Sequence, residues 1–234
     1  MSVENDLKPT IADHIHSAIS VMTSVVPGGS ELFNLLVDKP INARRDQWII
    51  ELEKRLRFLE SHGLKINDLQ NNDEFISAVL YASYIAIRNH SEEKRKALLN
   101  AITNIALKTN IDETKEKMFL NYIDDFTDWH LKILWYFENP KQRFADANKA
   151  IRLQHKAGIS VYFHEFLSEN KLNLELVKLI LNDLNTKGLL EINQARFNSI
   201  QDTSPLATLY NDDPLKQRLT DLGREFINFI RIAE

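Results

Sequence analysis

The chain has 234 residues, 44% of them apolar and 26% charged, with a formal net charge of −4 at pH 7. This length and apolar fraction suffice for a packed core without covalent staples, and the charge balance excludes a global attraction to nucleic acid or anionic lipid. The sequence contains no cysteine, which excludes disulfides, thiolate metal sites and cysteine nucleophiles, and we expect a cytoplasmic protein.

The N-terminal part begins with a polar leader and continues with helical patterns. Apolar spacing predicts a helix over residues 10–26, ended by Pro27-Gly28-Gly29, and a short helix through residues 32–36. No basic segment followed by an apolar one opens the chain, and charges interrupt its most apolar stretch, residues 11–37. We therefore expect neither a signal peptide nor stable membrane insertion.

The third predicted helix covers residues 40–61, with Gly63 as its stop. Arg45 projects into the same sector as the apolar stripe that contains Trp48, and Arg44 lies at the edge of that sector. A partly buried guanidinium favours a carboxylate or phosphate in fork geometry. We predict an acidic partner for Arg45 elsewhere in the fold and keep, as the less favoured alternative, an anion bound by Arg44 and Arg45.

Two more helices are predicted, one through Phe75 to Ala86 and one that begins at Glu92-Glu93 and carries apolar residues up to Ala106, with a tight joint at residues 89–91. Asp73 is expected to cap the first, and Glu92 and Glu93 suit the positive end of the second. The mixed charges of residues 92–96 are typical of a solvated surface rather than of a binding patch.

Residues 113–137 contain no glycine or proline and predict one continuous helix, about 37 Å long at ~1.5 Å per residue. His130 projects into its apolar stripe, so we predict that this side chain is buried and hydrogen-bonded. Asp124 and Asp128 lie roughly 120–160° away on the helix, which excludes a shared metal ion. One of the acids in this helix is a candidate partner of Arg45.

We place a domain boundary near residue 140, because the character of the chain changes there. Helices are predicted over residues 141–157, 159–170 and 174–187, the last closing on Gly188. A short strand at 189–192, a loop at 193–217, a second strand at 218–220 and a final helix follow. The sequence thus predicts a mainly α protein: an N-terminal multi-helix bundle, residues 1–140, and a small C-terminal unit with a short β-hairpin, residues 141–234.

The C-terminal unit carries two motifs, Leu184-Asn185-Thr186-Lys187-Gly188-Leu189-Leu190 and Leu219-Thr220-Asp221-Leu222-Gly223. Together they resemble the end of a recognition helix entering the first wing strand, and the exit from the second, in a winged helix-turn-helix. The resemblance implies DNA binding through the helix at residues 174–187. The candidate contacts to DNA or to a partner are Lys178, Lys187, Arg218 and Arg224.

The charge of this unit disfavours DNA binding. Residues 151–234 contain about as many acids as bases, whereas contacts to phosphate need clustered cations. We therefore place protein contact or dimerisation ahead of DNA reading.

The N-terminal part also carries a resemblance. Its motifs are Pro27-Gly28-Gly29, Arg44-Arg45-Asp46-Gln47-Trp48, Glu93-Lys94-Arg95-Lys96-Ala97-Leu98 with Asn100 and Asn104, and Phe126-Thr127-Asp128-Trp129-His130-Leu131. These resemble uncharacterised bacterial helical proteins broadly similar to abortive-infection proteins of the Abi-alpha kind. The resemblance covers roughly residues 20–137, implies a role in phage defence and brings no catalytic residues.

The sequence has no phosphate-binding glycine loop, no His-Glu-x-x-His motif and no serine in a nucleophile elbow. We expect a non-enzymatic adaptor without cofactor or metal, acting on another protein or on a second copy. The alternatives are a DNA-binding regulator and an anion- or nucleotide-binding protein centred on Arg44 and Arg45.

Overall fold

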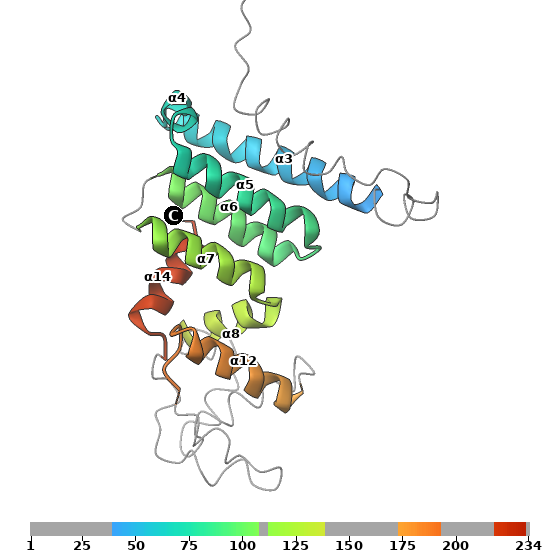
Figure 1. The fold of residues 1–234 in the computed structure, drawn as a ribbon, viewed down its shortest axis with the longest axis vertical. Coiled ribbons are helices and arrows are strands. Elements are labelled where there is room, and N and C mark those ends of the chain that lie inside the picture. Colours follow the sequence, from blue (N-terminus) through green and yellow to red (C-terminus); the bar gives the residue numbers. More distant parts are fainter. Residues whose placement is uncertain (1–38, 108–111, 139–172, 193–217, 233–234) are drawn as a thin grey trace, which may run out of the picture. The chain divides into compact units, whose positions relative to one another are not determined.

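The computed structural model describes residues 39–107, 112–138, 173–192 and 218–232 (Figure 1). Over these residues the chain is mainly helical, as the sequence predicts, and no strand forms among them. None of the helices in these ranges combines the length and the apolar character needed to cross a membrane. The predicted helices at 10–26, 32–36, 141–157 and 159–170, and the loop at 193–217, lie outside the described residues.

Contacts divide the chain into two compact units, residues 1–125 with 229–234, and residues 126–228. The boundary expected near residue 140 falls at the start of 139–172, outside the described residues. The domains 1–140 and 141–234 therefore stay a prediction, and each compact unit is described below by itself.

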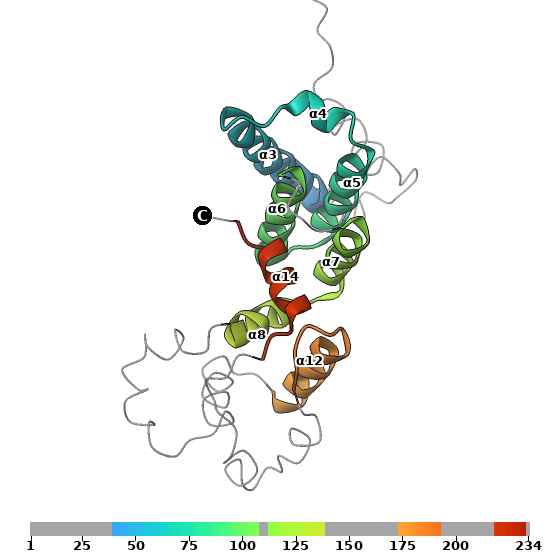
Figure 2. The same cartoon turned by 90° about the vertical axis from the view of Figure 1, so that its left-hand side faces the viewer.

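The first unit contains five described helices: α3 (Lys39–Ser61), α4 (Ile66–Gln70), α5 (Asp73–Arg88), α6 (Glu92–Ala106) and α7 (Glu113–Asp125). In Figures 1 and 2, α5 and α6 lie between α3 and α7, and α6 contacts α3, α5 and α7. The short helix α4 packs against α5. The core consists of apolar side chains at helical spacing from all four long helices, among them Trp48, Phe75, Leu98, Ile102 and Phe119.

Local chemistry fixes the helix ends of this unit. After α3, Gly63 takes φ 98°, and the amide of Leu64 bonds the carbonyl of Leu59, as in a Schellman motif. The cap of α5 is Asn72, whose side chain accepts from the amide of Phe75, so the prediction of Asp73 as the cap was wrong by one residue. Ser91 caps α6 in the same way.

The continuous helix predicted over residues 113–137 was wrong, because the structure ends α7 at Asp125 and begins α8 at Asp128. The break needs no glycine or proline, since Thr127 and His130 supply the capping interactions of a new helix. The backbone amide of Thr127 donates to Nδ1 of His130, 3.1 Å away. This is the reciprocal half of a capping box, with histidine in the place of the usual Glu or Gln.

The second unit contains α8 (Asp128–Glu138), α12 (Leu174–Thr186) and most of α14 (Asp221–Phe229), and α8 packs against α12. Gly188 ends α12 at φ 73°, as predicted, with the amide of Leu189 bonded to the carbonyl of Leu184. Leu190 and Leu219 then form a single antiparallel bridge. The two segments predicted as a β-hairpin thus pair with each other, although neither forms a strand.

The start of α14 lies against the end of this bridge. A Cβ atom placed on Gly223 would lie 2.1 Å from the carbonyl oxygen of Leu189. Only glycine allows this approach, since real Cβ atoms do not come so close to a backbone oxygen. The hydroxyl of Thr220 accepts from the amide of Gly223 and donates to the carbonyl of Gly188, which joins the two glycine positions.

Candidate functional site

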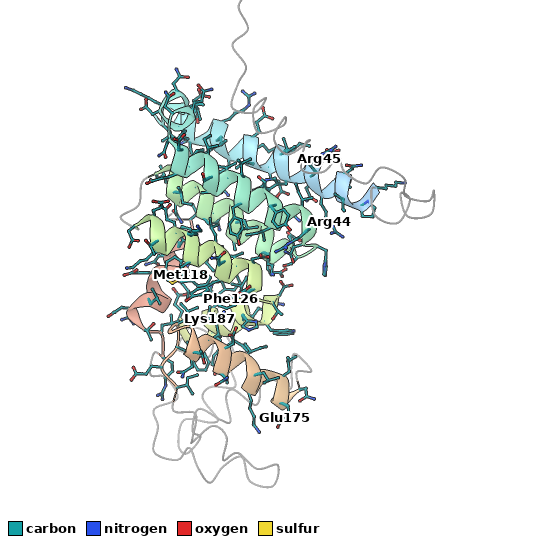
Figure 3. All side chains as sticks on the ribbon, viewed as in Figure 1. Arg44, Arg45, Met118, Phe126, Glu175 and Lys187 are labelled. Carbon is teal, nitrogen blue, oxygen red and sulfur yellow. The ribbon has the colours of Figure 1, made fainter. Side chains whose placement is uncertain are left out.

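The predicted anion site, Arg44 and Arg45, lies on α3 (Figure 3). The guanidinium of Arg45 is half-buried and donates through Nε and NH2 to Asp46, at 3.1 and 3.0 Å. Arg44 donates to the main-chain carbonyl of Arg88, 3.5 Å away. The carboxylate seen at Arg45 thus comes from its neighbour in the sequence, and binding of an anion by this pair stays a prediction.

Asp124 of α7, one of the acids considered as a partner of Arg45, pairs instead with Arg88 of α5. Arg88 also donates to the hydroxyl of Tyr84 and lies over its ring, with 4.6 Å from Cζ to the centroid. The bond to Asp124 raises the pKa of Arg88, while burial followed by the charge of Asp124 raises the pKa of Tyr81. This cluster joins α5 to the last turn of α7.

Lys94 of α6 reaches the same helix end. Its side chain is 7% exposed, and its Nζ donates to the main-chain carbonyl of Asp124 at 2.7 Å. Carbonyls in the last turn of a helix lack intrahelical partners and carry partial negative charge, so a lysine there satisfies both needs. Arg88 and Lys94 thus hold the side chain and the backbone of one residue, Asp124.

His130 is buried, 9% exposed, and hydrogen-bonded, as the sequence predicted. Its ring stacks on Phe126 with 4.9 Å between centroids, and Nε2 lies 3.4 Å from a carboxylate oxygen of Asp183. The hydroxyl of Thr127 lies 2.9 Å from Nδ1. Hydroxyl, imidazole and carboxylate thus follow one another as in a hydrolase triad, but Nδ1 also receives the Thr127 amide, which assigns it to helix capping.

Two predicted contact residues, Lys178 on α12 and Lys187 directly after it, both bind carboxylates of that helix. Nζ of Lys178 donates to Oε1 of Glu175 at 2.9 Å, and Nζ of Lys187 lies 3.7 Å from Oδ1 of Asp183. The two ends of this helix are labelled by Glu175 and Lys187 in Figure 3. These pairs neutralise the cations that a DNA-reading helix would present to phosphate.

Arg218 and Arg224, the other two predicted contacts, lie around the Leu190–Leu219 bridge. The Nε and NH2 atoms of Arg218 are buried. Arg224 pairs with Asp221 and donates to the carbonyl of Leu219 at 2.9 Å. The structure therefore places Arg218 and Arg224 at the bridge, with Arg224 bound to a carboxylate and a backbone carbonyl.

The outer face of α12 carries two exposed leucines that the sequence analysis did not single out. Leu176 is 44% exposed and Leu179 is 67% exposed, whereas Val177, Ile180, Leu181 and Leu184 are buried. At 100° per residue, Leu179 falls near the middle of the exposed sector, beside Asn182 and Thr186. We call Leu176, Leu179, Asn182 and Thr186 the α12 face, and it is the candidate functional surface.

A second set of polar residues, Asn100 and Asn104 of α6, was quoted from the sequence only as part of a resemblance. Their amides donate to three successive carbonyls of the chain, those of Phe229, Ile230 and Arg231. The sequence shows that two asparagines lie one helical turn apart and so share a face of α6. This spacing does not show that they bind the backbone of a segment more than 120 residues away.

No protein-family model, curated protein or solved structure matches the chain. Among the residues that the structure describes, no group of three or more His, Asp or Glu side chains could hold a metal ion.

Proposed function

We propose that this chain is a non-enzymatic interaction protein whose second unit, of winged-helix kind, pairs with the same unit of a second copy through the α12 face. The observation that carries the proposal is the 67% exposure of Leu179, in the middle of the face that a winged helix would turn toward DNA. A leucine side chain at this position forms no hydrogen bond or ion pair with phosphate. Its transfer from water to an apolar surface of a partner is favourable.

A second copy fits this face because the charged residues that lie within the same sector of α12, Glu175 and Asp183, are already compensated. Glu175 is bonded to Lys178, and Asp183 has Lys187 within 3.7 Å, so two such helices meet without a charge of one sign left over. An isologous dimer needs this self-complementarity, since the same surface serves both partners. Two leucines on each copy bury little area, which predicts weak, concentration-dependent pairing.

The wider setting of the proposal rests on the resemblances. The order α12, Gly188, paired segments and α14 supports a winged-helix-like unit, and the packing of α3, α5, α6 and α7 supports an N-terminal multi-helix bundle. The likeness of residues 20–137 to abortive-infection proteins supports a bacterial, cytoplasmic role in phage defence. DNA reading is less favoured, because the lysines of α12 are bound to carboxylates.

Sedimentation velocity over a concentration series tests the pairing. The wild-type chain is expected to shift from monomer toward dimer as its concentration rises, and L176E/L179E to stay monomeric. Ile50→Glu is the matched control, since Ile50 is an aliphatic residue of α3 with 52% exposure, and it should pair as the wild type does. A wild-type chain that remains monomeric throughout contradicts the proposal.

The same samples test the DNA alternative. A labelled duplex shifted at about 50 mM salt by the wild type, and not by K178E/K187E, would establish DNA binding in place of pairing, because phosphate contacts are strongest at low ionic strength.

A further inference from the structure

The last described residues of the chain occupy a site on the first unit, although more than 100 residues separate them from the helices that form it. Contacts assign residues 229–234 to the unit made by residues 1–125. The site is formed by Asn100 and Asn104 of α6 and by Phe119 of α7.

The polar part of this site is specific for backbone. Asn104 donates to the carbonyls of Phe229 and Arg231, both at 2.8 Å, and Asn100 donates to that of Ile230 at 2.9 Å. Phe229 is the last residue of α14, so these carbonyls lie at a helix end, where intrahelical donors are missing. Asn104 is only 4% exposed, which makes its amide a fixed feature of the site.

The apolar part of the site recognises side chains. The ring of Phe229 lies 5.4 Å from that of Phe119, and both rings are buried. Ile230 is 2% exposed. Two amides that bind carbonyls, combined with apolar contacts for Phe229 and Ile230, have the features of a peptide-binding site, which its own chain fills.

We propose that this site, which we call the tail site, also accepts residues 229–231 of a second copy, so that two chains can exchange their C-terminal segments. The hydrogen bonds to Asn100 and Asn104 and the ring contact with Phe119 are all made by residues 229–231 and would be the same in trans, which is the condition for exchange of an identical element. The chain's own segment is present at an effective concentration on the order of millimolar, so exchange needs a high protein concentration or a loosened segment.

Complementation between two full-length variants tests the exchange. F229A/I230A keeps the tail site and weakens the segment, whereas N100A/N104A keeps the segment and weakens the site. Each variant alone should remain monomeric, and an equimolar mixture should form a heterodimer, since the intact segment of one chain meets the intact site of the other. Both variants carry L176E/L179E, so that pairing through the α12 face does not contribute and the two proposals fail or succeed separately.

Sedimentation velocity measures the mixture, and circular dichroism verifies that each variant is folded. Where either double change unfolds the chain, the milder pair Ile230→Ala and Asn100→Ala replaces it. We expect a heterodimer at total concentrations of about 100 µM that is absent when both chains carry the same variant. A mixture of folded variants that sediments as two monomers up to millimolar concentration overturns the proposal.

Discussion

Several side-chain contacts of the first unit join different helices, whereas the ion pairs of Lys178, Lys187 and Arg224 in the second unit are local. In the first unit, Arg88 pairs with Asp124, Arg95 with Glu51, and the indole of Trp48 donates to Ser83, all between helices. The cations of α12 and α14 in the second unit pair three or four residues away. The first unit therefore has side-chain ion pairs that fix one helix against another, whereas in the second unit these three cations pair within their own segment and the close approach of Gly223 to Leu189 joins α14 to the bridge.

The largest expected effect concerns the backbone approach in the second unit. Gly223→Ala puts a Cβ 2.1 Å from the carbonyl oxygen of Leu189, and the helix start must move. Overpacking of this kind costs about 3 kcal/mol. Urea unfolding followed by circular dichroism measures the loss. Gly63→Ala is the control: its Cβ meets no atom within 4 Å, so only the strain of φ 98°, about 1 kcal/mol, should appear.

The next effect concerns a buried side-chain contact between α3 and α5. Nε1 of Trp48 donates to Oγ of Ser83 at 2.8 Å, and both residues are fully buried. Ser83→Ala leaves the indole N–H without this acceptor, which costs about 2 kcal/mol. Hydrogen exchange of α3 and α5 should accelerate. Ser61→Ala, at an exposed serine of α3, should change little, and an equal effect of both variants would refute the assignment.

Two substitutions, Arg88→Met and Lys178→Met, compare an ion pair between two helices with an ion pair within one helix. Arg88→Met removes a contact between two helices, and about 1 kcal/mol is expected, because the pair is partly exposed. Lys178→Met removes a pair within one helix, and its expected effect is below about 0.5 kcal/mol. Chemical unfolding of both variants at low and high salt gives the values. Equal losses would mean that sequence distance does not separate the two kinds of pair.

At the start of α8, a capping contact between neighbouring residues is expected to contribute a similar free energy to stability. His130→Ala removes the acceptor for the Thr127 amide, and the loss of a capping interaction costs about 1 kcal/mol. His130→Gln, which places an amide oxygen at the usual capping-box position, should restore part of it. Hydrogen exchange at residues 127–130 is the measurement. A Gln variant no better than the Ala variant would show that ring stacking, rather than capping, holds this turn.

The smallest effect concerns the carboxyl of Glu116 on α7. Burial, followed by the charges of Glu74, Glu113 and Asp112, raises its pKa. Its protonated form is favoured by folding, so this contribution to stability is complete below the unfolded pKa of about 4.3 and is lost as pH rises through the folded pKa.

Glu116→Gln should therefore raise the urea midpoint at pH 7 by the equivalent of at most about 0.5 kcal/mol and make the midpoint depend less on pH above the unfolded pKa of the carboxyl. The exposed Glu60→Gln serves as the control. A lower midpoint for Glu116→Gln at pH 7 would contradict the assigned sign.

The sequence by itself determined several of the helix ends, because these signals lie within a few residues of each other. Gly63 and Gly188 stop helices through φ values that favour glycine, and polar caps start others. The break at Phe126 was missed although its signal, Thr127 followed three residues later by His130, is equally local. Histidine is an uncommon residue in that role, and no glycine or proline marks the site.

Only the tertiary structure decided which distant groups meet. The pairing of Asp124 with Arg88, the contact of Asn104 with the carbonyls of Phe229 and Arg231, and the exposure of Leu179 all depend on how helices pack. Periodicity assigns a residue to a face of its helix, but it does not say which other element, if any, covers that face. For this reason the fold class followed from the sequence, whereas the α12 face and the tail site required coordinates.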